Sequence, residues 1–89
     1  MLNLKIKYFL DPKGVVYFPT WYAEVYREAS QQRGFIKMRY KAEGNTFTVY
    51  LSFLNKETLE SWASTAKHDE FVVQIEAHFT KPEEVEYFS

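Results

Sequence analysis

Hydrophobic and polar side chains alternate along the first ten residues, with the two-residue period of a β-strand buried on one face. The apolar residues of one parity are Leu2, Leu4, Ile6, Tyr8 and Leu10. Asp11-Pro12-Lys13-Gly14 follows, and we expect a turn there because proline presets φ and glycine tolerates positive φ. The pattern predicts a strand over 2–10.

A helical period replaces this alternation further along the chain. Apolar residues recur at steps of three and four residues, at Trp21, Tyr22, Val25, Tyr26 and Ala29. Pro19 suits the first turn of a helix, and Gly34 is a stop signal. We therefore predict a helix over about 19–32.

Two more alternating segments follow the predicted helix. In the first, Ile36, Met38 and Tyr40 oppose Lys37, Arg39 and Lys41; in the second, Phe47, Val49, Leu51 and Phe53 line one face. Glu43-Gly44-Asn45 between them reads as a tight connection, so the two segments are predicted to form a hairpin.

The last third of the chain contains one clear helix and one ambiguous segment. Asn55 can cap a helix with Leu59, Trp62 and Ala63 on its apolar face. Residues 68–79 fit a helix and a strand equally well by period, and their Val-Val and Ile content favours a strand. If 68–79 is helical, the last strand lies at 83–88; otherwise 81–89 form a C-terminal arm.

This order of elements predicts an α+β fold, the ferredoxin-like βαββαβ plan, as a single domain over 1–89. Two helices would cover one face of a four-stranded antiparallel sheet. The chain has 89 residues and is 19% aromatic, and its aromatic residues fall on both strand parities, as Phe9, Phe35, Phe47 and Tyr50 show. We expect the second face to be partly apolar and to be covered in a homodimer.

Composition argues against several classes of function. The chain has no cysteine, and His68 and His78 are ten residues apart without a partner at metal-ligand spacing, so no metal site is expected. Arg33 to Tyr40 resembles an RNA-binding signature, but Lys37 stands where that signature has a stacking aromatic. With a net charge of −1, no nucleic-acid partner is expected. Neither a signal peptide nor a membrane span is apparent, so cytoplasm is the default.

The strands also carry basic residues that would form a continuous stripe if they all point to the same face of the sheet. It would consist of Lys5, Lys7, Lys37, Arg39 and Lys41, if these residues share one face of the sheet. Otherwise they are ordinary solvated strand residues.

Trp62 and His68 are the candidate functional residues, each with an ordinary alternative. Trp62 lies on the apolar face of its helix, as a core residue would. His68 lies in a polar stretch, where a histidine is commonly solvated or caps a helix. Ser64, His68 and Asp69 are close in sequence, but no nucleophile motif presents them, and we expect Asp69 to cap the following turn.

The segment FLNKETLESWASTAKHDEF, with QQRGFIKMRY before it, resembles the antibiotic biosynthesis monooxygenase family of dimeric α+β barrels. The resemblance covers about 50 of the 89 residues. The matching features are Gly34-Phe35, Phe53, the polar cap 55–57, the helix 59–63 and His68. The resemblance implies a homodimer whose sheets face each other, with a cavity in each subunit between helices and sheet.

The resemblance also implies a function. In a cofactor-independent monooxygenase acting on a small aromatic substrate, Tyr22, Tyr26 and Trp62 would shape the pocket, and His68 would deprotonate or orient the substrate. Some relatives cleave haem with a first-strand Asn, a Trp and a following His. Trp62 matches that Trp, but Lys5 or Lys7 takes the Asn position and His68 follows at a shorter spacing, so no cofactor is expected. The alternative is a non-catalytic dimer that binds a small ligand or a protein.

Overall fold

Four antiparallel strands form one sheet in the order β2-β3-β1-β4, with β1 paired on both edges. The computed structural model describes residues 1–88. In chain order the elements are β1 (Leu2–Leu10), α1 (Pro12–Ala29), β2 (Phe35–Glu43), β3 (Thr46–Phe53), α2 (Lys56–Ala63), α3 (Ala66–Glu76) and β4 (Phe79–Phe88). The predicted α+β, ferredoxin-like plan is confirmed, with two short helices in place of the second one.

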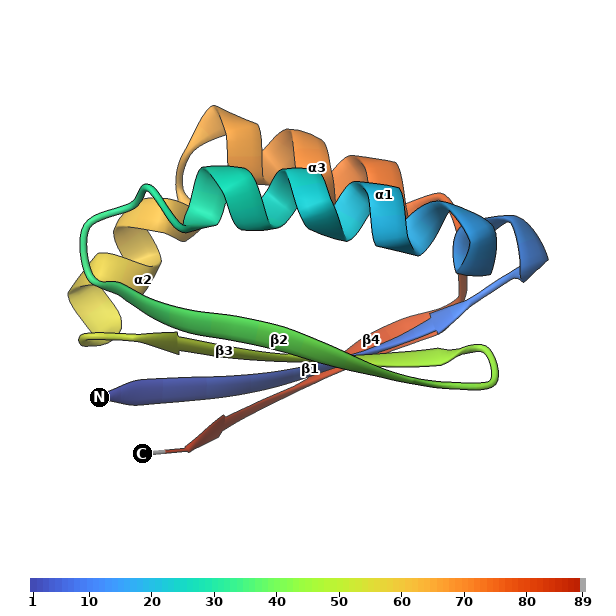
Figure 1. Ribbon diagram of the computed structural model, residues 1–89, viewed down its shortest axis with the longest axis horizontal. Coiled ribbons are helices and arrows are strands. Elements are labelled where there is room, and N and C mark those ends of the chain that lie inside the picture. The colour runs from blue at the N-terminus through green and yellow to red at the C-terminus, as the bar shows by residue number, and fades with distance from the viewer. Residues whose placement is uncertain (89) are drawn as a thin grey trace.

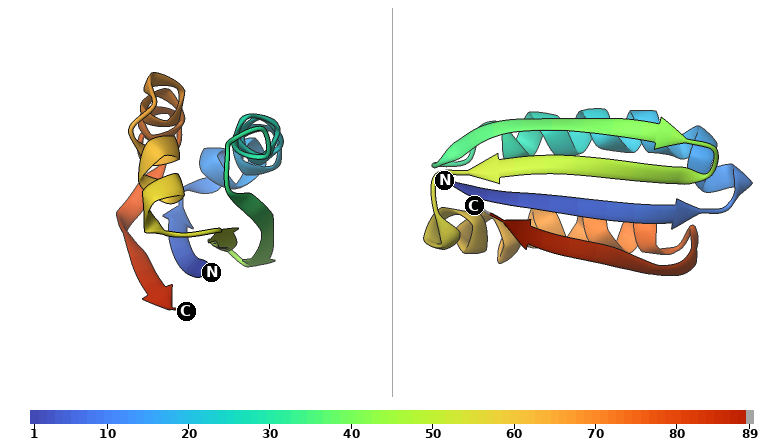
Figure 2. Two further views of the ribbon diagram at one scale, coloured as in Figure 1. Left: turned by 90° about the vertical axis from the view of Figure 1, so that its left-hand side faces the viewer. Right: turned by 90° about the horizontal axis from the view of Figure 1, so that it is seen from below.

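All three helices lie on the same face of the sheet (Figure 1). Seen along the strands, α1 lies over the β2 side, whereas α2 and α3 lie over the β4 side (Figure 2). The Trp21 indole Nε1 donates a hydrogen bond of 2.9 Å to the backbone oxygen of Phe71, which joins α1 to α3. No helix among residues 1–88 has the length and apolar character needed to cross a membrane.

The core fills the space between the helices and the sheet. Its buried residues are Leu4, Leu10, Phe18, Trp21, Val25, Ala29, Phe47, Val49, Leu51, Phe53, Leu59, Trp62, Phe71 and Ile75. The strand residues among them have the parity that the alternating pattern predicted to be apolar. The two-residue period therefore identified the buried face correctly for β1 and β3.

The first helix begins earlier than predicted. Asp11 is its N-cap and accepts a 2.7 Å hydrogen bond from the Gly14 backbone N–H, with Pro12 at the first helical position. Pro19 lies inside α1, where it cannot donate to the carbonyl four residues before it. The expected turn at 11–14 is therefore the first turn of α1. Pro12, and not Pro19, occupies the first turn, where a proline needs no N–H donor.

The ambiguous segment is helical, so the preference for a strand was wrong. Thr65 is the N-cap of α3, and Phe71 and Ile75 are buried at a spacing of four residues. Burial of that stripe outweighs the modest strand propensity of the valines. Asp69 lies in the first turn of α3 and does not cap it. Strand β4 then starts at Phe79, before the predicted residue 83.

The open face, meaning the sheet face away from the helices, is more polar than expected. Phe47 is buried in the core and Phe35 packs against it, because a register shift between Phe35 and Lys37 turns Phe35 towards the helices. Phe9 and Tyr50 lie on the open face, and each has a cation over its ring: Lys81 at 4.0 Å and Arg39 at 4.7 Å. Of the four aromatic residues from which an apolar second face was predicted, only Phe9 and Tyr50 therefore lie on that face.

The basic residues of β1 and β2 do share the open face. Lys5 and Arg39 both pair with Tyr50, and Lys7 and Lys41 both pair with Thr48. Strand β3 lies between β1 and β2, so the two groups of basic residues are on strands that are not neighbours. On the other edge, β4 places Glu84 and Glu86 opposite Lys7 and Lys5.

Gly34 and Gly44 both have positive φ, but their surroundings differ. Gly34 has a φ of +86°, and a Cβ there would lie 2.5 Å from the Thr58 side chain. Gly44 has a φ of +62°, and a Cβ there would meet no atom of residues 1–88 within 4 Å. We predict that Gly44→Ala costs about 1 kcal/mol from backbone strain alone. Gly34→Ala should cost about 2–4 kcal/mol because overpacking against α2 adds to the same strain.

Urea denaturation of the two variants and the parent protein measures this difference. Equal losses would show that α2 shifts freely away from Gly34, which would contradict close packing at that contact.

Candidate functional site

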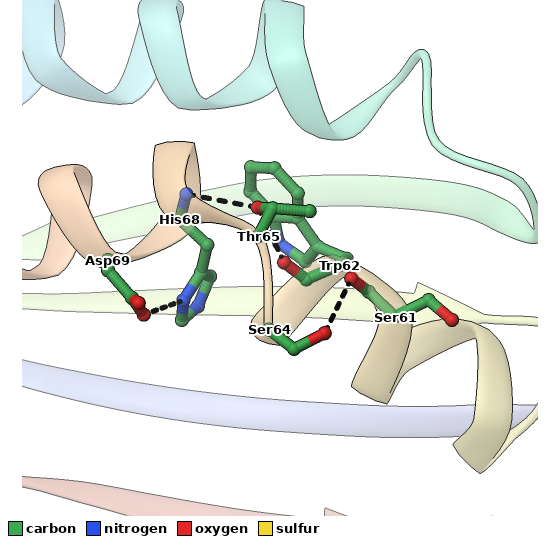
Figure 3. Close-up of polar contacts among 6 residues, drawn as sticks. All are labelled: Ser61, Trp62, Ser64, Thr65, His68 and Asp69. Carbon is green, nitrogen blue, oxygen red and sulfur yellow. Dashed lines mark hydrogen bonds and ion pairs between the residues drawn. The ribbon is translucent and has the colours of Figure 1, made fainter.

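Trp62 and His68 are held together by the joint between α2 and α3. The Thr65 hydroxyl donates a 2.9 Å hydrogen bond to the backbone oxygen of Trp62 and accepts one of 3.1 Å from the backbone N–H of His68 (Figure 3). One side chain therefore fixes the last turn of α2 against the first turn of α3.

The two candidate side chains are in contact. Their ring centroids are 5.3 Å apart, and the planes meet edge to face at 83°. Trp62 is 3% exposed, as a core residue should be, and the His68 side chain is 30% exposed. Trp62 is therefore a buried core residue, and its indole also packs against the imidazole of His68.

A cavity of about 230 Å³ lies beside this pair, between the sheet and helices α2 and α3. Its lining residues are Leu4, Ile6, Tyr8, Leu51, Leu59, Trp62, Ala63, His68, Val72, Ile75, Phe79, Glu83, Val85 and Tyr87. A smaller hollow of about 60 Å³, lined by several of the same residues, extends the space towards Trp21 and Val25 on α1. The family resemblance implied a cavity in this position.

Four polar side chains line the larger cavity, on walls that are otherwise apolar. They are Tyr8, His68, Glu83 and Tyr87. Burial raises the pKa of the Tyr8 hydroxyl, and the negative charge of Glu83 raises it further. Tyr8 therefore stays protonated at neutral pH and can donate a hydrogen bond into the cavity.

The imidazole of His68 has one nitrogen that is buried and one edge that a ligand could reach. Among residues 1–88, Nδ1 has no hydrogen-bond partner. The Asp69 Oδ1 is 3.7 Å away, too far for a hydrogen bond, and the Asp69 side chain is 75% exposed. Since Nδ1 is sealed from solvent, the exposed part of the ring includes its other edge, which carries Nε2.

The nearby Ser64 does not form a catalytic arrangement with His68. Its hydroxyl donates a 3.1 Å hydrogen bond to the backbone oxygen of Ser61, within its own helix end (Figure 3). A nucleophilic serine would require a hydrogen bond to the histidine. This agrees with the lack of a nucleophile motif in the sequence.

Tyr22 and Tyr26, which the sequence predicted to shape the pocket with Trp62, do not line this cavity. Tyr22 packs against Phe18, at 5.9 Å between centroids, and Tyr40, at 4.6 Å, and Tyr26 packs against Phe35 at 5.8 Å. They occupy the stripe of α1 that faces β2, whereas Trp21 and Val25 reach the hollow near His68. Burial raises the pKa of Tyr22, and Tyr26 and Tyr40 contribute to the rise.

The remaining candidate residues from the sequence, His78, Lys5 and Lys7, do not line the cavity. His78 is beyond the far end of α3, with its Nδ1 3.2 Å from Asp11 Oδ1. No three His, Asp or Glu side chains within residues 1–88 form a group that could hold a metal ion. Lys5 and Lys7, which were compared with the Asn of haem-cleaving relatives, have the parity of the open face, and β1 presents Leu4, Ile6 and Tyr8 to the cavity.

Tyr8 and Glu83 are site residues that the sequence analysis missed. Tyr8 shares the parity of Leu4 and Ile6, so it was counted among the apolar strand residues. Glu83 lies at the predicted start of the last strand. The pairing of β4 with β1 shifts register between Lys7 and Phe9, close to this residue. No period in the sequence marks such a shift.

Removing the Thr65 hydroxyl should loosen the joint that places His68. We predict that Thr65→Val lowers the free energy of unfolding by about 1–2 kcal/mol, because the α3 cap is lost. Thr65→Ser keeps both hydrogen bonds and should lose little. Ser64→Ala is the matched control, since it removes a neighbouring exposed hydroxyl. Chemical denaturation compares the variants, and equal losses in Thr65→Val and Ser64→Ala would contradict the role of the joint.

Comparison with known proteins identifies the fold by structure and not by sequence. No family model matches the chain, and no curated protein matches it. A crystal structure of an antibiotic biosynthesis monooxygenase superposes with a TM-score of 0.90 at 16% identity, covering 100% of this chain and 97% of that one. A conserved protein from Methanosarcina mazei Go1 gives a TM-score of 0.90 at 14% identity, covering 98% and 89%.

SnoaB, a cofactor-independent oxygenase from Streptomyces nogalater, gives a TM-score of 0.88 at 12% identity, covering 99% of this chain and 90% of its own. Similarity at these identities establishes a common fold, because folds are shared by proteins of unrelated activity. The chain has the fold seen in structures of antibiotic biosynthesis monooxygenases.

Proposed function

We propose that this protein is a cofactor-independent monooxygenase that oxidises a small hydroxylated aromatic substrate in the cavity beside Trp62. The observation that carries the proposal is the position of His68. Its imidazole rests edge-on against Trp62 at the wall of a largely apolar cavity. An imidazole is the side chain best suited to accept a proton near neutral pH.

The chemistry needs a base and a water-poor pocket. A phenol bound against the apolar walls gives its proton to Nε2 of His68, which leaves an electron-rich phenolate and an imidazolium. The phenolate reduces O₂ directly, and the substrate supplies all the electrons. One oxygen atom becomes a carbonyl oxygen on a ring carbon ortho or para to the phenolate, which gives a quinone. The other oxygen atom leaves as water, with the hydrogen of that ring carbon and the hydrogen of the phenol.

A neighbouring group supports this proton transfer. The Tyr8 hydroxyl can donate a hydrogen bond to the developing phenolate or carbonyl oxygen. The fold shared with SnoaB, a cofactor-independent oxygenase, supports the same class of reaction.

Oxygen uptake with a panel of hydroquinones and anthrones tests the proposal. We expect turnover above the buffer rate, and a loss of about 10²- to 10⁴-fold in His68→Ala, the usual contribution of a general base. His78→Ala is the matched control because it removes the other histidine, beyond the far end of α3. Turnover that is absent, or unaffected by His68→Ala, would overturn the proposal. Binding without conversion would identify a ligand-binding module.

We further propose that the protein is a homodimer, a dimeric α+β barrel closed through the open face. The two edges of this face have opposite net charges. Strand β2 carries Lys37, Arg39 and Lys41 with Glu43, and β4 carries Glu84 and Glu86 with Lys81. A two-fold axis parallel to the strands would place β2 of one copy opposite β4 of the other. Such an arrangement pairs opposite charges and buries Phe9 and Tyr50, which lie on the two central strands of the sheet.

Sedimentation equilibrium at tens of micromolar should give a mass of about twice 10.6 kDa, and the melting temperature should rise with protein concentration. Arg39→Glu should weaken the dimer several-fold by placing like charges together. Lys56→Glu, on the exposed surface of α2, is the charge-matched control. A 10.6 kDa species whose melting is independent of concentration would contradict the dimer.

A further inference from the structure

The volume of the cavity limits the number of rings in a ligand. An apolar cavity of about 150 Å³ holds benzene. Scaling by heavy atoms, two fused rings need roughly 250 Å³ and three need roughly 350 Å³. The cavity beside Trp62 has about 230 Å³, and the adjoining hollow adds about 60 Å³. Two rings therefore fit within the protein, and a third would stand outside.

The mouth of the cavity is formed by half-exposed apolar side chains. Val72 is 37% exposed and Val85 is 46% exposed, and both line the cavity. A third ring would lie between them and solvent without a wall on its outer side. Such a ring gains less burial energy than one enclosed on both faces.

The charges around the cavity are of one sign. Among the described residues that line it, Glu83 alone is formally charged at neutral pH if His68 is neutral, and none of them is a Lys or Arg. An anionic substituent that enters the cavity loses hydration and finds no Lys or Arg in this lining to pair with. It also meets the like charge of Glu83, although the exposure of Glu83 to solvent weakens that repulsion. A neutral hydroxyl finds acceptors and donors at His68 and Tyr8.

We propose that this cavity selects uncharged phenols and hydroquinones of one or two rings, and that Glu83 excludes their carboxylated analogues. The inference rests on the proposed function for the identity of the substrate as a phenol. The selectivity itself is a property of binding, which can be measured without oxygen. Binding and turnover can therefore fail independently.

The charge selectivity is tested by anaerobic calorimetry with 1,4-dihydroxynaphthalene and its 2-carboxylate. We expect the carboxylate to bind at least about tenfold more weakly, as 1.4 kcal/mol of repulsion and desolvation would require. Glu83→Gln should reduce that difference several-fold. Glu76→Gln, which removes a carboxylate that does not line the cavity, should leave it unchanged. Equal binding of the two compounds, or no effect of Glu83→Gln, would overturn the role of Glu83.

The size selectivity is tested with hydroquinone, dihydroxynaphthalene and anthrone. Two-ring binding should exceed three-ring binding, and Val72→Phe should weaken two-ring binding more than one-ring binding by filling the mouth. Val73→Phe is the matched control, because Val73 is 66% exposed and does not line the cavity. Three-ring binding as tight as two-ring binding, or no binding by any compound, would overturn the inference. Tight selective binding without oxygen uptake would overturn only the proposed function.

Discussion

Burial of a single face of the sheet is the constraint on which the rest of the structure depends. Phe47, Val49 and Leu51 on β3 and Leu4 on β1 have to be covered, and each such side chain contributes about 1.5–3 kcal/mol when it leaves water. The helices supply that cover, with α1 tied to α3 by the Trp21 indole. Because all helices are needed on this side, the opposite face is left mainly to charged and hydroxyl-bearing side chains, with Phe9 among them.

The cavity exists because the cover on the β4 side is made of two short helices. A single straight helix would pack along the sheet with its apolar stripe in continuous contact. The break at Thr65 instead changes the direction of the chain between Trp62 and His68 (Figure 3). The indole of Trp62 and the imidazole of His68 are in contact at this break, and the apolar face of the sheet lies below them. The candidate chemistry thus depends on a local capping interaction as much as on the global fold.

The sequence predicted the order of the elements and the buried position of Trp62 well, because hydrophobic period and helix capping are local properties. Strands β1 to β3, the Asn55 cap and the burial of Trp62 all follow from spacing within one element. The errors arose where a decision depended on other elements. Pro12 and Pro19 both suit a helix start, and only packing extends the buried stripe back to Phe18 and Gly14.

Similar reasons explain why the residues that line the cavity differ from those named in the sequence analysis. Tyr22 and Tyr26 share the helix with Trp21 and Val25, and sequence spacing does not say which stripe faces which strand. Glu83 faces the cavity on a strand that pairs with β1 through shifts in register, which depend on both strands at once. The volume of the cavity has no local signal, because residues from three strands and two helices enclose it.

The central position of β1 has a consequence for how the protein is made. Its first partner, β3, follows about forty residues later, and its second partner, β4, is the last element described. During synthesis β1 must wait until β4 has left the ribosome before both its edges are paired. Until then an apolar strand has a free edge to which a strand of another chain could add. The lysines at positions 5 and 7 interrupt that strand with like charges on every copy. They therefore discourage pairing between nascent chains during the interval in which this protein is most open to aggregation.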